Sequence, residues 1–156
     1  MAIELALYQP DIPQNTGTLL RLGACLGVPV HIIHPTGFVF SDKNFKRAAM
    51  DYANKVQMRQ HDSFSRFNDW RLANNKRLIL LSTKSAFSLY DFAFSRSDIL
   101  LMGRESAGVP DQVLRCCDHS ARLPMAQNMR SLNVALAAAM AIGEAMRQSD
   151  GFNDLS

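Results

Sequence analysis

Three segments of the chain gather amide, arginine, carboxylate and hydroxyl side chains around glycine and proline. They read PDIPQNTGTLLR (10–21), GRESAGVP (103–110) and PMAQNMRSLN (124–133), and each follows a short apolar run. Arginine and amide groups donate hydrogen bonds to anions, and such donors can stabilise negative charge that develops during a reaction. If the fold brings the three segments together, they would form a polar ligand-binding or catalytic site.

Familiar nucleotide-binding signatures do not explain these segments. Gly103 and Gly108 have the two-glycine spacing of a P-loop, but Val109 and Pro110 stand where that motif needs lysine and serine or threonine. The chain also lacks a G-x-G-x-x-G sequence. A nucleotide triphosphatase and a standard dinucleotide-binding fold are therefore disfavoured.

The histidines do not suggest a metal site. His31 and His34 are three residues apart on an expected strand, so they face opposite sides of it. His61 and His119 have no ligand-like neighbours in the sequence, so we predict no bound metal.

The elements that must position the polar segments alternate between strands and helices. This alternation predicts an α/β fold with a mainly parallel sheet and helices on both faces. In such a sheet, ligands bind outside the carboxyl ends of the strands, where all three polar segments begin. The expected strands are 3–8, 30–34, 55–60, 77–82, 98–103 and 120–125, and the expected helices are 16–27, 41–52, 63–74, 110–117 and 131–148.

Each polar residue also has a purely structural interpretation. Asn15 and Gly17 could belong to a turn or cap at a helix start, and Arg21 could be an ordinary surface charge. Glu105 could cap the helix at 110, and Asn133 could bind free amides at the start of the last helix. A site is favoured because the three segments fall at the same edge of the sheet.

Length and composition describe one ordinary domain. The 156 residues lack repeats and linkers, so we expect a single domain over 1–156 with a flexible tail at 149–156. A net charge of +3 permits a nucleic-acid partner without requiring one. The sequence predicts no membrane segment, and its N-terminus reads as a strand and not as a signal peptide. Three cysteines, two of them adjacent, are a poor disulfide framework and fit a reducing cytoplasm.

The order PQNTGTLLR, LMGRESAGVP and RLPM…RSLNVALAAAMA resembles the three motifs of the SPOUT methyltransferases, in their TrmH-like branch. The segments LYQPDIPQNTGTLLRLGACLG, HIIHPTGF, DKNFKRAAMDY and LSTKS make the TrmL (YibK) group the most similar, over about residues 1–148. The resemblance implies a homodimeric enzyme that uses S-adenosyl-L-methionine to methylate the ribose 2′-hydroxyl of the tRNA wobble nucleotide. That nucleotide, at position 34, is cytidine or uridine, and leucine tRNAs are the expected substrates. The implied fold has a deep trefoil knot in its C-terminal part, which periodicity does not predict.

The resemblance also assigns roles to single residues. Arg21 would hold the target phosphate and hydroxyl and stabilise the developing alkoxide, and Asn15 would order the same loop. Ser131 and Asn133 would position the ribose or the methionine end of the cofactor. Gly103 would let the backbone approach the cofactor closely. The cofactor-binding residues implied are Leu81, Gly103, Glu105, Leu123 and Ser131.

The implied RNA partner, a tRNA anticodon stem-loop, requires positive charge. Lys43, Lys46 and Arg47 lie at helical spacing and could form a basic face, which Lys84 and Arg130 could extend. A solvated surface explains each of these charges equally well.

Other functions remain open at this point. The chain departs from the family pattern at Ala135, Leu136 and Gly143. A 2′-O-methyltransferase for ribosomal RNA or another tRNA position is one alternative, and a non-catalytic RNA-binding module is another. A small-molecule enzyme on a doubly wound sheet is disfavoured by the motif set.

Overall fold

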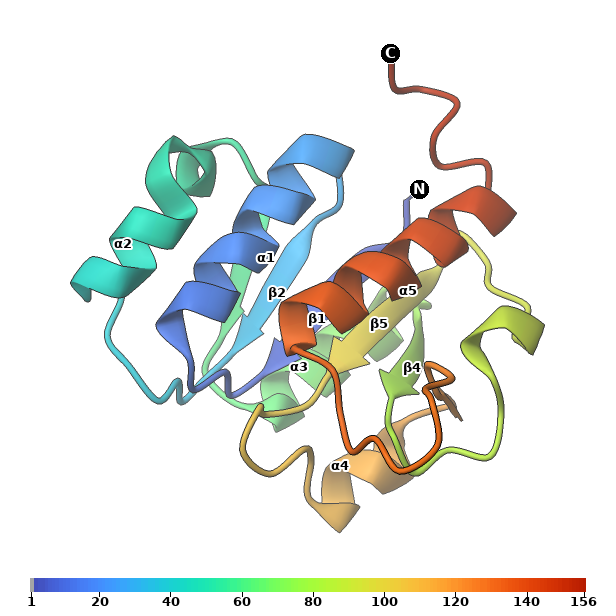
Figure 1. Ribbon diagram of the computed structural model, residues 1–156. Helices are drawn as coiled ribbons and strands as arrows, with labels where there is room; N and C mark the ends of the chain where they lie inside the picture. The colour runs from blue at the N-terminus through green and yellow to red at the C-terminus, as the bar shows by residue number, and fades with distance from the viewer. Residues whose placement is uncertain (1) are drawn as a thin grey trace.

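The computed structural model describes residues 2–156 and, of these, every side chain apart from those at positions 50 and 51. Its core is a six-stranded sheet of order β3-β2-β1-β5-β4-β6, in which the strand pairings are parallel. Figure 1 labels the four middle strands, β2, β1, β5 and β4. The predicted α/β fold with a parallel sheet is confirmed. The strands are β1 Glu4–Tyr8, β2 Val30–Ile33, β3 Met58–His61, β4 Arg77–Leu81, β5 Asp98–Met102 and β6 His119–Ala121.

The observed helices follow the predicted order, but some of them begin or end at other residues than predicted. The expected helix 41–52 divides into α2 and a 3-10 turn, η1, and the expected helix 131–148 begins only after Asn133. No helix within the described part of the chain is long and apolar enough to cross a membrane. The helices are α1 Pro13–Leu26, α2 Lys43–Ala49, η1 Met50–Asn54, α3 Phe64–Ala73, η2 Leu89–Asp91, α4 Asp111–Cys116 and α5 Val134–Gln148.

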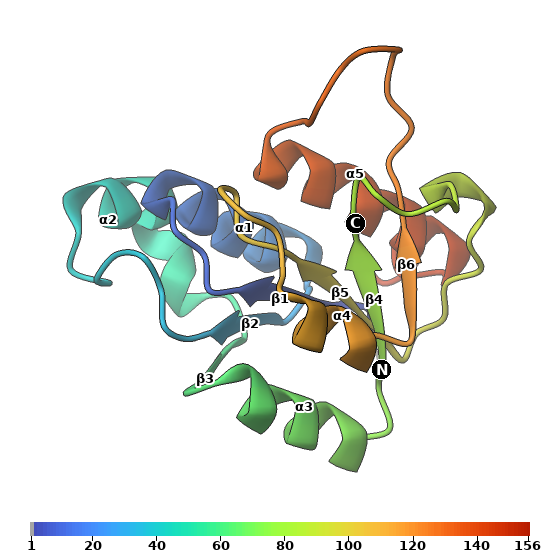
Figure 2. The ribbon, with the colours of Figure 1, turned by 90° about the horizontal axis from the view of Figure 1, so that it is seen from below.

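Helices cover both faces of the sheet, as predicted. Figure 2 shows α1, α2 and α5 on one side and α3 and α4 on the other. The alternation of side chains along β1 matches this arrangement, because Leu5 and Leu7 join the α1–α5 core while Ala6 and Tyr8 join the α3–α4 core. β1 and β5 are buried along their whole length, as expected for central parallel strands.

Close contact between α1 and α2 fixes the start of α1. A Cβ atom on Gly17 would lie only 2.5 Å from the Ala48 Cβ and 2.7 Å from the Ala49 backbone nitrogen. Glycine at this position therefore serves helix packing. The suggested cap role is wrong, because the N-cap of α1 is Ile12.

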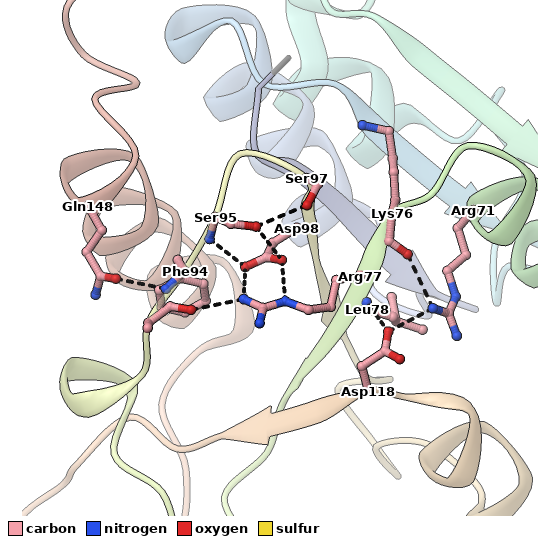
Figure 3. Close-up of polar contacts among 11 residues, drawn as sticks. Arg71, Lys76, Arg77, Leu78, Phe94, Ser95, Ser97, Asp98, Asp118 and Gln148 are labelled. Atoms are coloured by element: carbon pink, nitrogen blue, oxygen red, sulfur yellow. Dashed lines mark hydrogen bonds and ion pairs between the residues drawn. The ribbon is translucent and has the colours of Figure 1, made fainter.

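Ion pairs fix the amino ends of β4 and β5 (Figure 3). The Arg77 guanidinium donates to both carboxylate oxygens of the fully buried Asp98 at 2.7 Å, and the Ser95 amide donates to the same carboxylate. Beside them, Asp118 accepts hydrogen bonds from the Leu78 amide and from Arg71. These bonds hold the end of the sheet opposite the polar segments.

Candidate active site

A cavity of about 760 Å³ lies at the carboxyl ends of β4 and β5, where the three polar segments meet. Asn15 enters it from α1, Gly103 to Val109 from the loop after β5, and Ser131 to Asn133 from the loop before α5. A volume of this size suits a small-molecule or cofactor site. The predicted meeting of the three segments is therefore confirmed.

The structure brings most of the expected site residues to this cavity. Arg21 and the expected RNA-binding residues other than Lys84 lie outside its lining. The lining includes the expected residues Asn15, Leu81, Lys84, Gly103, Glu105, Leu123, Ser131 and Asn133.

A fourth segment, LSTKS (81–85), which the sequence analysis did not place among the polar segments, completes the wall. Ser82, Thr83 and Ser85 follow β4 and line the cavity beside Lys84. Their hydroxyl-rich sequence directly after an apolar strand was the signal that could have identified them. They add hydrogen-bonding groups opposite the loop after β5.

The loop after β5 folds back on itself. The Arg104 amide donates to the Gly108 carbonyl at 2.9 Å, and the Gly108 amide donates to the Arg104 carbonyl at 2.8 Å. A Cβ atom on Gly103 would lie 2.8 Å from the Gly108 backbone, and Gly108 itself has a φ of +66°. The loop's own backbone is thus an immediate reason for glycine at 103, and the left-handed conformation is the reason at 108.

Two carboxyl groups join this loop to the loop after β1. The Asp11 amide donates to Glu105 Oε2 at 3.2 Å, and the Ser106 hydroxyl donates to the Asp11 carboxylate. Arg104 lies 3.8 Å from the same carboxylate. Glu105 therefore binds the β1–α1 loop and does not cap α4, whose N-cap is Pro110.

The paired carboxyl groups have opposite pKa shifts. Partial burial and the neighbouring Asp11 raise the pKa of Glu105 to about 7. The hydrogen bond with Glu105 lowers the pKa of Asp11. Because two adjacent carboxylates repel each other, the pair holds one proton at pH values below about 7. Asp11 Oδ1, which is buried without a described partner, is an acceptor available to that proton.

Asn133 links the first and third polar segments. Its side-chain oxygen accepts from the Ala135 amide at 2.8 Å and the Leu136 amide at 3.2 Å, which caps α5. Its side-chain nitrogen donates to Asn15 Oδ1 at 3.2 Å. The capping role is therefore confirmed, and the same residue holds Asn15 at the cavity.

Arg21 is exposed on α1 and points toward the α2–η1 side. Its guanidinium carbon lies 4.8 Å from the centre of the Tyr52 ring, and Lys55 Nζ lies 5.9 Å from that centre. On α2, Lys43, Lys46 and Arg47 are all exposed. We call these exposed cations the basic surface; they lie on α1 and α2, which pack against each other, and just after η1.

A buried polar network on the other face of the sheet was missed by the sequence analysis. His31 Nε2 lies 2.8 Å from Glu4 Oε1, and His31 Nδ1 lies 2.9 Å from His61 Nε2. Lys76 pairs with the second Glu4 oxygen. His61 therefore has a ligand-like neighbour in His31, contrary to the prediction. Burial, with His31 and Arg59 nearby, lowers the pKa of His61 to about 4.

No group of three or more histidine, cysteine or acidic side chains among the described residues is arranged to hold a metal ion. The cavity instead combines apolar walls, such as Leu81 and Leu123, with the Glu105 carboxyl and backbone groups of the glycine loop. This donor set suits an organic molecule that has both a flat apolar part and a charged polar part.

Comparisons with known proteins agree with this description. A model of the SpoU rRNA methylase family matches residues 2–143. The tRNA (cytidine(34)-2'-O)-methyltransferase of Beijerinckia indica subsp. indica is 57% identical over 144 residues, which are 92% of this chain and 90% of that protein.

Two solved structures share the fold. One, which concerns the 2-OH methylation of C/U34 on tRNA, is 43% identical with a TM-score of 0.88 and covers 94% of this chain and 95% of that one. The other, the SpoU methyltransferase AviRb from Streptomyces viridochromogenes in complex with the cofactor AdoMet, is 25% identical with a TM-score of 0.87 and covers 94% of this chain and 60% of that one. The resemblance carried by the three motifs is confirmed, and the chain belongs to the SpoU methylase family.

Proposed function

We propose that this protein transfers the methyl group of S-adenosylmethionine to the ribose 2′-hydroxyl of the tRNA wobble nucleotide, a cytidine or uridine. The cavity that the three motif segments build at the carboxyl edge of the sheet carries this proposal. The names of relatives that match nearly the whole chain support the same substrate.

The cavity residues fit S-adenosylmethionine. Leu81 and Leu123 offer apolar surface for the adenine, and the loop from Gly103 offers backbone groups for hydrogen bonds. Glu105 lies where it could meet a polar group of the cofactor. When bound, the cofactor supplies an activated methyl group on its sulfonium. The AdoMet complex of the related AviRb supports this assignment.

Within the cavity, Asn15, Ser131 and Asn133 would orient the target ribose against the cofactor. The Asn15–Asn133 hydrogen bond supports a common role, because it fixes both amides at one wall. Orientation of two reactants can supply roughly 7–11 kcal/mol of a barrier. Arg21 would bind the target phosphate and stabilise the developing alkoxide, since arginine stays protonated and donates only. The proton of the 2′-hydroxyl would pass to the neighbouring phosphate of the RNA.

A homodimer would reconcile this role with the position of Arg21 outside the cavity. Exposed apolar residues include Ile12 and Leu132, which line the cavity, and Leu136 and Met140 on α5. A second copy packed on this face would cover them and could bring its own Arg21 to the cavity. The protein would then work as a dimer of single domains, each comprising residues 1–156.

The basic surface would bind the anticodon stem-loop. Lys43, Lys46 and Arg47 would contact phosphates, while Lys84 at the cavity and Arg130 in the loop before α5 would act closer to the target. Such contacts make the affinity fall steeply with salt concentration. An anticodon loop presents an accessible base, so little unpairing energy is needed.

The deep trefoil knot is part of the proposal. The placement of β4 between β5 and β6 and the long loop between β6 and α5 (Figure 2) are compatible with it. The similarity to SpoU methyltransferases supports it.

The first experiment incubates the purified protein with labelled S-adenosylmethionine and bulk tRNA from a strain that lacks this activity. Mass spectrometry of the modified nucleosides should find a 2′-O-methyl group at the wobble position and identify the tRNAs that carry it. Arg21→Ala should abolish most turnover, whereas Arg66→Ala, an exposed arginine on α3, should not. Methylation of ribosomal RNA alone would replace the proposed substrate. Near-normal turnover of Arg21→Ala would contradict the role of Arg21.

A further inference from the structure

Tyr52, in η1, lies under two cations that come from different elements. The Arg21 guanidinium carbon, from α1, is 4.8 Å from the ring centre, and Lys55 Nζ is 5.9 Å from it. Both distances are within the range of roughly 6 Å at which the face of an aromatic ring attracts a cation. Tyr52 has no assigned role in the proposed reaction.

The backbone around Tyr52 is firmly held. The Tyr52 carbonyl accepts hydrogen bonds from the Lys55 amide at 2.9 Å and the Val56 amide at 3.1 Å, and the Val56 side chain is buried. The contact of Gly17 with Ala48 and Ala49 fixes α1 against the same region. The ring therefore sits at a defined position relative to the helix that carries Arg21.

Stacking on an aromatic face preserves what an RNA-binding arginine needs. The N–H donors of a guanidinium lie in its plane, so a ring below that plane leaves them free for phosphate or hydroxyl oxygens. A carboxylate partner would occupy these donors and offset the charge. Lys55 adds a second positive charge over the same ring, which favours an anion nearby.

We propose that Tyr52 is a positioning residue, which holds the Arg21 guanidinium by its flat face and presents its N–H edge to the RNA backbone at the target nucleotide. An exposed arginine loses considerable side-chain entropy when a substrate orders it. A guanidinium already restrained by the ring loses less on binding, so the ring increases turnover without touching the RNA. This inference rests on the proposed function, because it assigns Arg21 to the reaction.

The contact itself can be tested without RNA. Tyr52→Phe keeps the aromatic face, whereas Tyr52→Leu keeps an apolar side chain and removes that face. In NMR spectra, ring-current shifts of the Arg21 side-chain protons should persist in Tyr52→Phe and disappear in Tyr52→Leu. Unshifted Arg21 protons in the natural protein would overturn the inference at once.

Kinetics then test the role. Tyr52→Leu should lower kcat at saturating tRNA by about two- to fivefold, as expected for an exposed cation–π contact, without changing the Kd of S-adenosylmethionine. Tyr52→Phe should keep the natural rate. Tyr52→Leu should have no further effect on the residual rate of Arg21→Ala, because the two residues act as a unit. Lys55→Ala is the control for the second cation and should mainly raise the KM for tRNA.

The outcomes separate this inference from the proposed function. If the natural protein methylates tRNA and Tyr52→Leu is equally active, the positioning role is wrong. If Tyr52→Leu lowers the rate of Arg21→Ala by the same factor as the rate of the natural protein, the loss reflects general structural damage. If Tyr52→Phe loses as much activity as Tyr52→Leu, the hydroxyl group is responsible. Either result overturns the inference. A natural protein that methylates no RNA would overturn the proposed function, and this role with it.

Discussion

The carboxyl pair of Glu105 and Asp11 should make the stability of the protein depend on pH. Because the pKa of Glu105 is raised to about 7 from an ordinary value of 4.5, the folded protein binds a proton that the unfolded chain releases between these values. The contribution of Glu105 to the free energy of unfolding should therefore fall as the pH rises from about 4.5 to 7 and level off above that range.

Urea unfolding of the natural protein and Glu105→Gln over this pH range checks the prediction. The variant cannot ionise at this position, so its stability should lack this decline. Parallel pH profiles for the two proteins would show that Glu105 has an ordinary pKa.

His61 should contribute the opposite slope over an overlapping pH range, so each contribution is measured as the difference between a variant and the natural protein. Its pKa is lowered to about 4 from an ordinary value of 6.5, so the unfolded chain binds more protons between these values. The contribution of His61 to the free energy of unfolding should therefore fall as the pH drops from about 6.5 to 4. His61→Gln should remove this loss in the same urea experiment. The control His34→Gln, which changes a half-buried histidine directly after β2, should keep it.

At the scale of residues, the sequence predicted which residues gather at the site better than it predicted which side chains pair with each other. It placed Asn15, Glu105 and Asn133 at one edge because each follows a strand. It could not pair Asp11 with Glu105, which meet only through the loop after β5. Glu4, His31 and His61 were missed for a similar reason, since they come from three strands and face away from the cavity.

Two helix glycines should respond oppositely to the same substitution. Gly17→Ala would place a methyl group 2.5 Å from the Ala48 Cβ, which forces α1 and α2 apart and should cost about 1–3 kcal/mol. A Cβ atom at Gly143, inside α5, meets nothing within 4 Å, so Gly143→Ala should stabilise the protein by up to about 1 kcal/mol. Thermal unfolding measures both, and equal effects would contradict the packing argument.

The buried carboxylate at the start of β5 should be among the costliest to remove. Asp98→Ala leaves the Arg77 guanidinium without its bidentate partner and the Ser95 amide without its acceptor (Figure 3), so a loss of about 3–5 kcal/mol is expected. Asp69→Ala, at an exposed position of α3, should stay within about 0.5 kcal/mol of the natural protein. Denaturant unfolding that finds equal losses would refute the role of the ion pair.

At the scale of elements, apolar runs predicted most of the fold. The runs at 77–82 and 98–103 became β4 and β5 almost unchanged, because strands buried on both faces are apolar throughout. The helix expected at 41–52 changed at Ala49, where the chain tightens into η1. The helix expected at 131–148 starts later because Asn133 caps it, and the preceding residues line the cavity.

For the whole molecule, the proposed homodimer predicts that a charge placed among the exposed apolar residues of α5 prevents dimerisation. Leu136 is 57% exposed on α5, so Leu136→Glu would place a carboxylate in the interface and should yield a monomer in analytical ultracentrifugation. Leu72 is 55% exposed on α3, on the opposite face, and Leu72→Glu should leave the mass unchanged. A natural protein that sediments as a monomer would contradict the homodimer.

The order of the strands is the part of the architecture that periodicity could not predict. Alternation of strands and helices indicates a parallel sheet, but many strand orders satisfy it. The position of β1 between β2 and β5 depends on contacts between distant parts of the chain. The implied knot came only from the resemblance, because no local pattern encodes it.

The central position of β1 has a consequence for how the protein is made. On one side β1 pairs with β2, which follows soon in the chain, but on the other Glu4 pairs with Ile99 of β5. During translation, the first strand leaves the ribosome long before its second neighbour exists. Its bare edge could pair with other nascent chains in the meantime. Yield in the cell should therefore depend on the speed of synthesis and on chaperones that shield this edge, even though the finished sheet buries it completely.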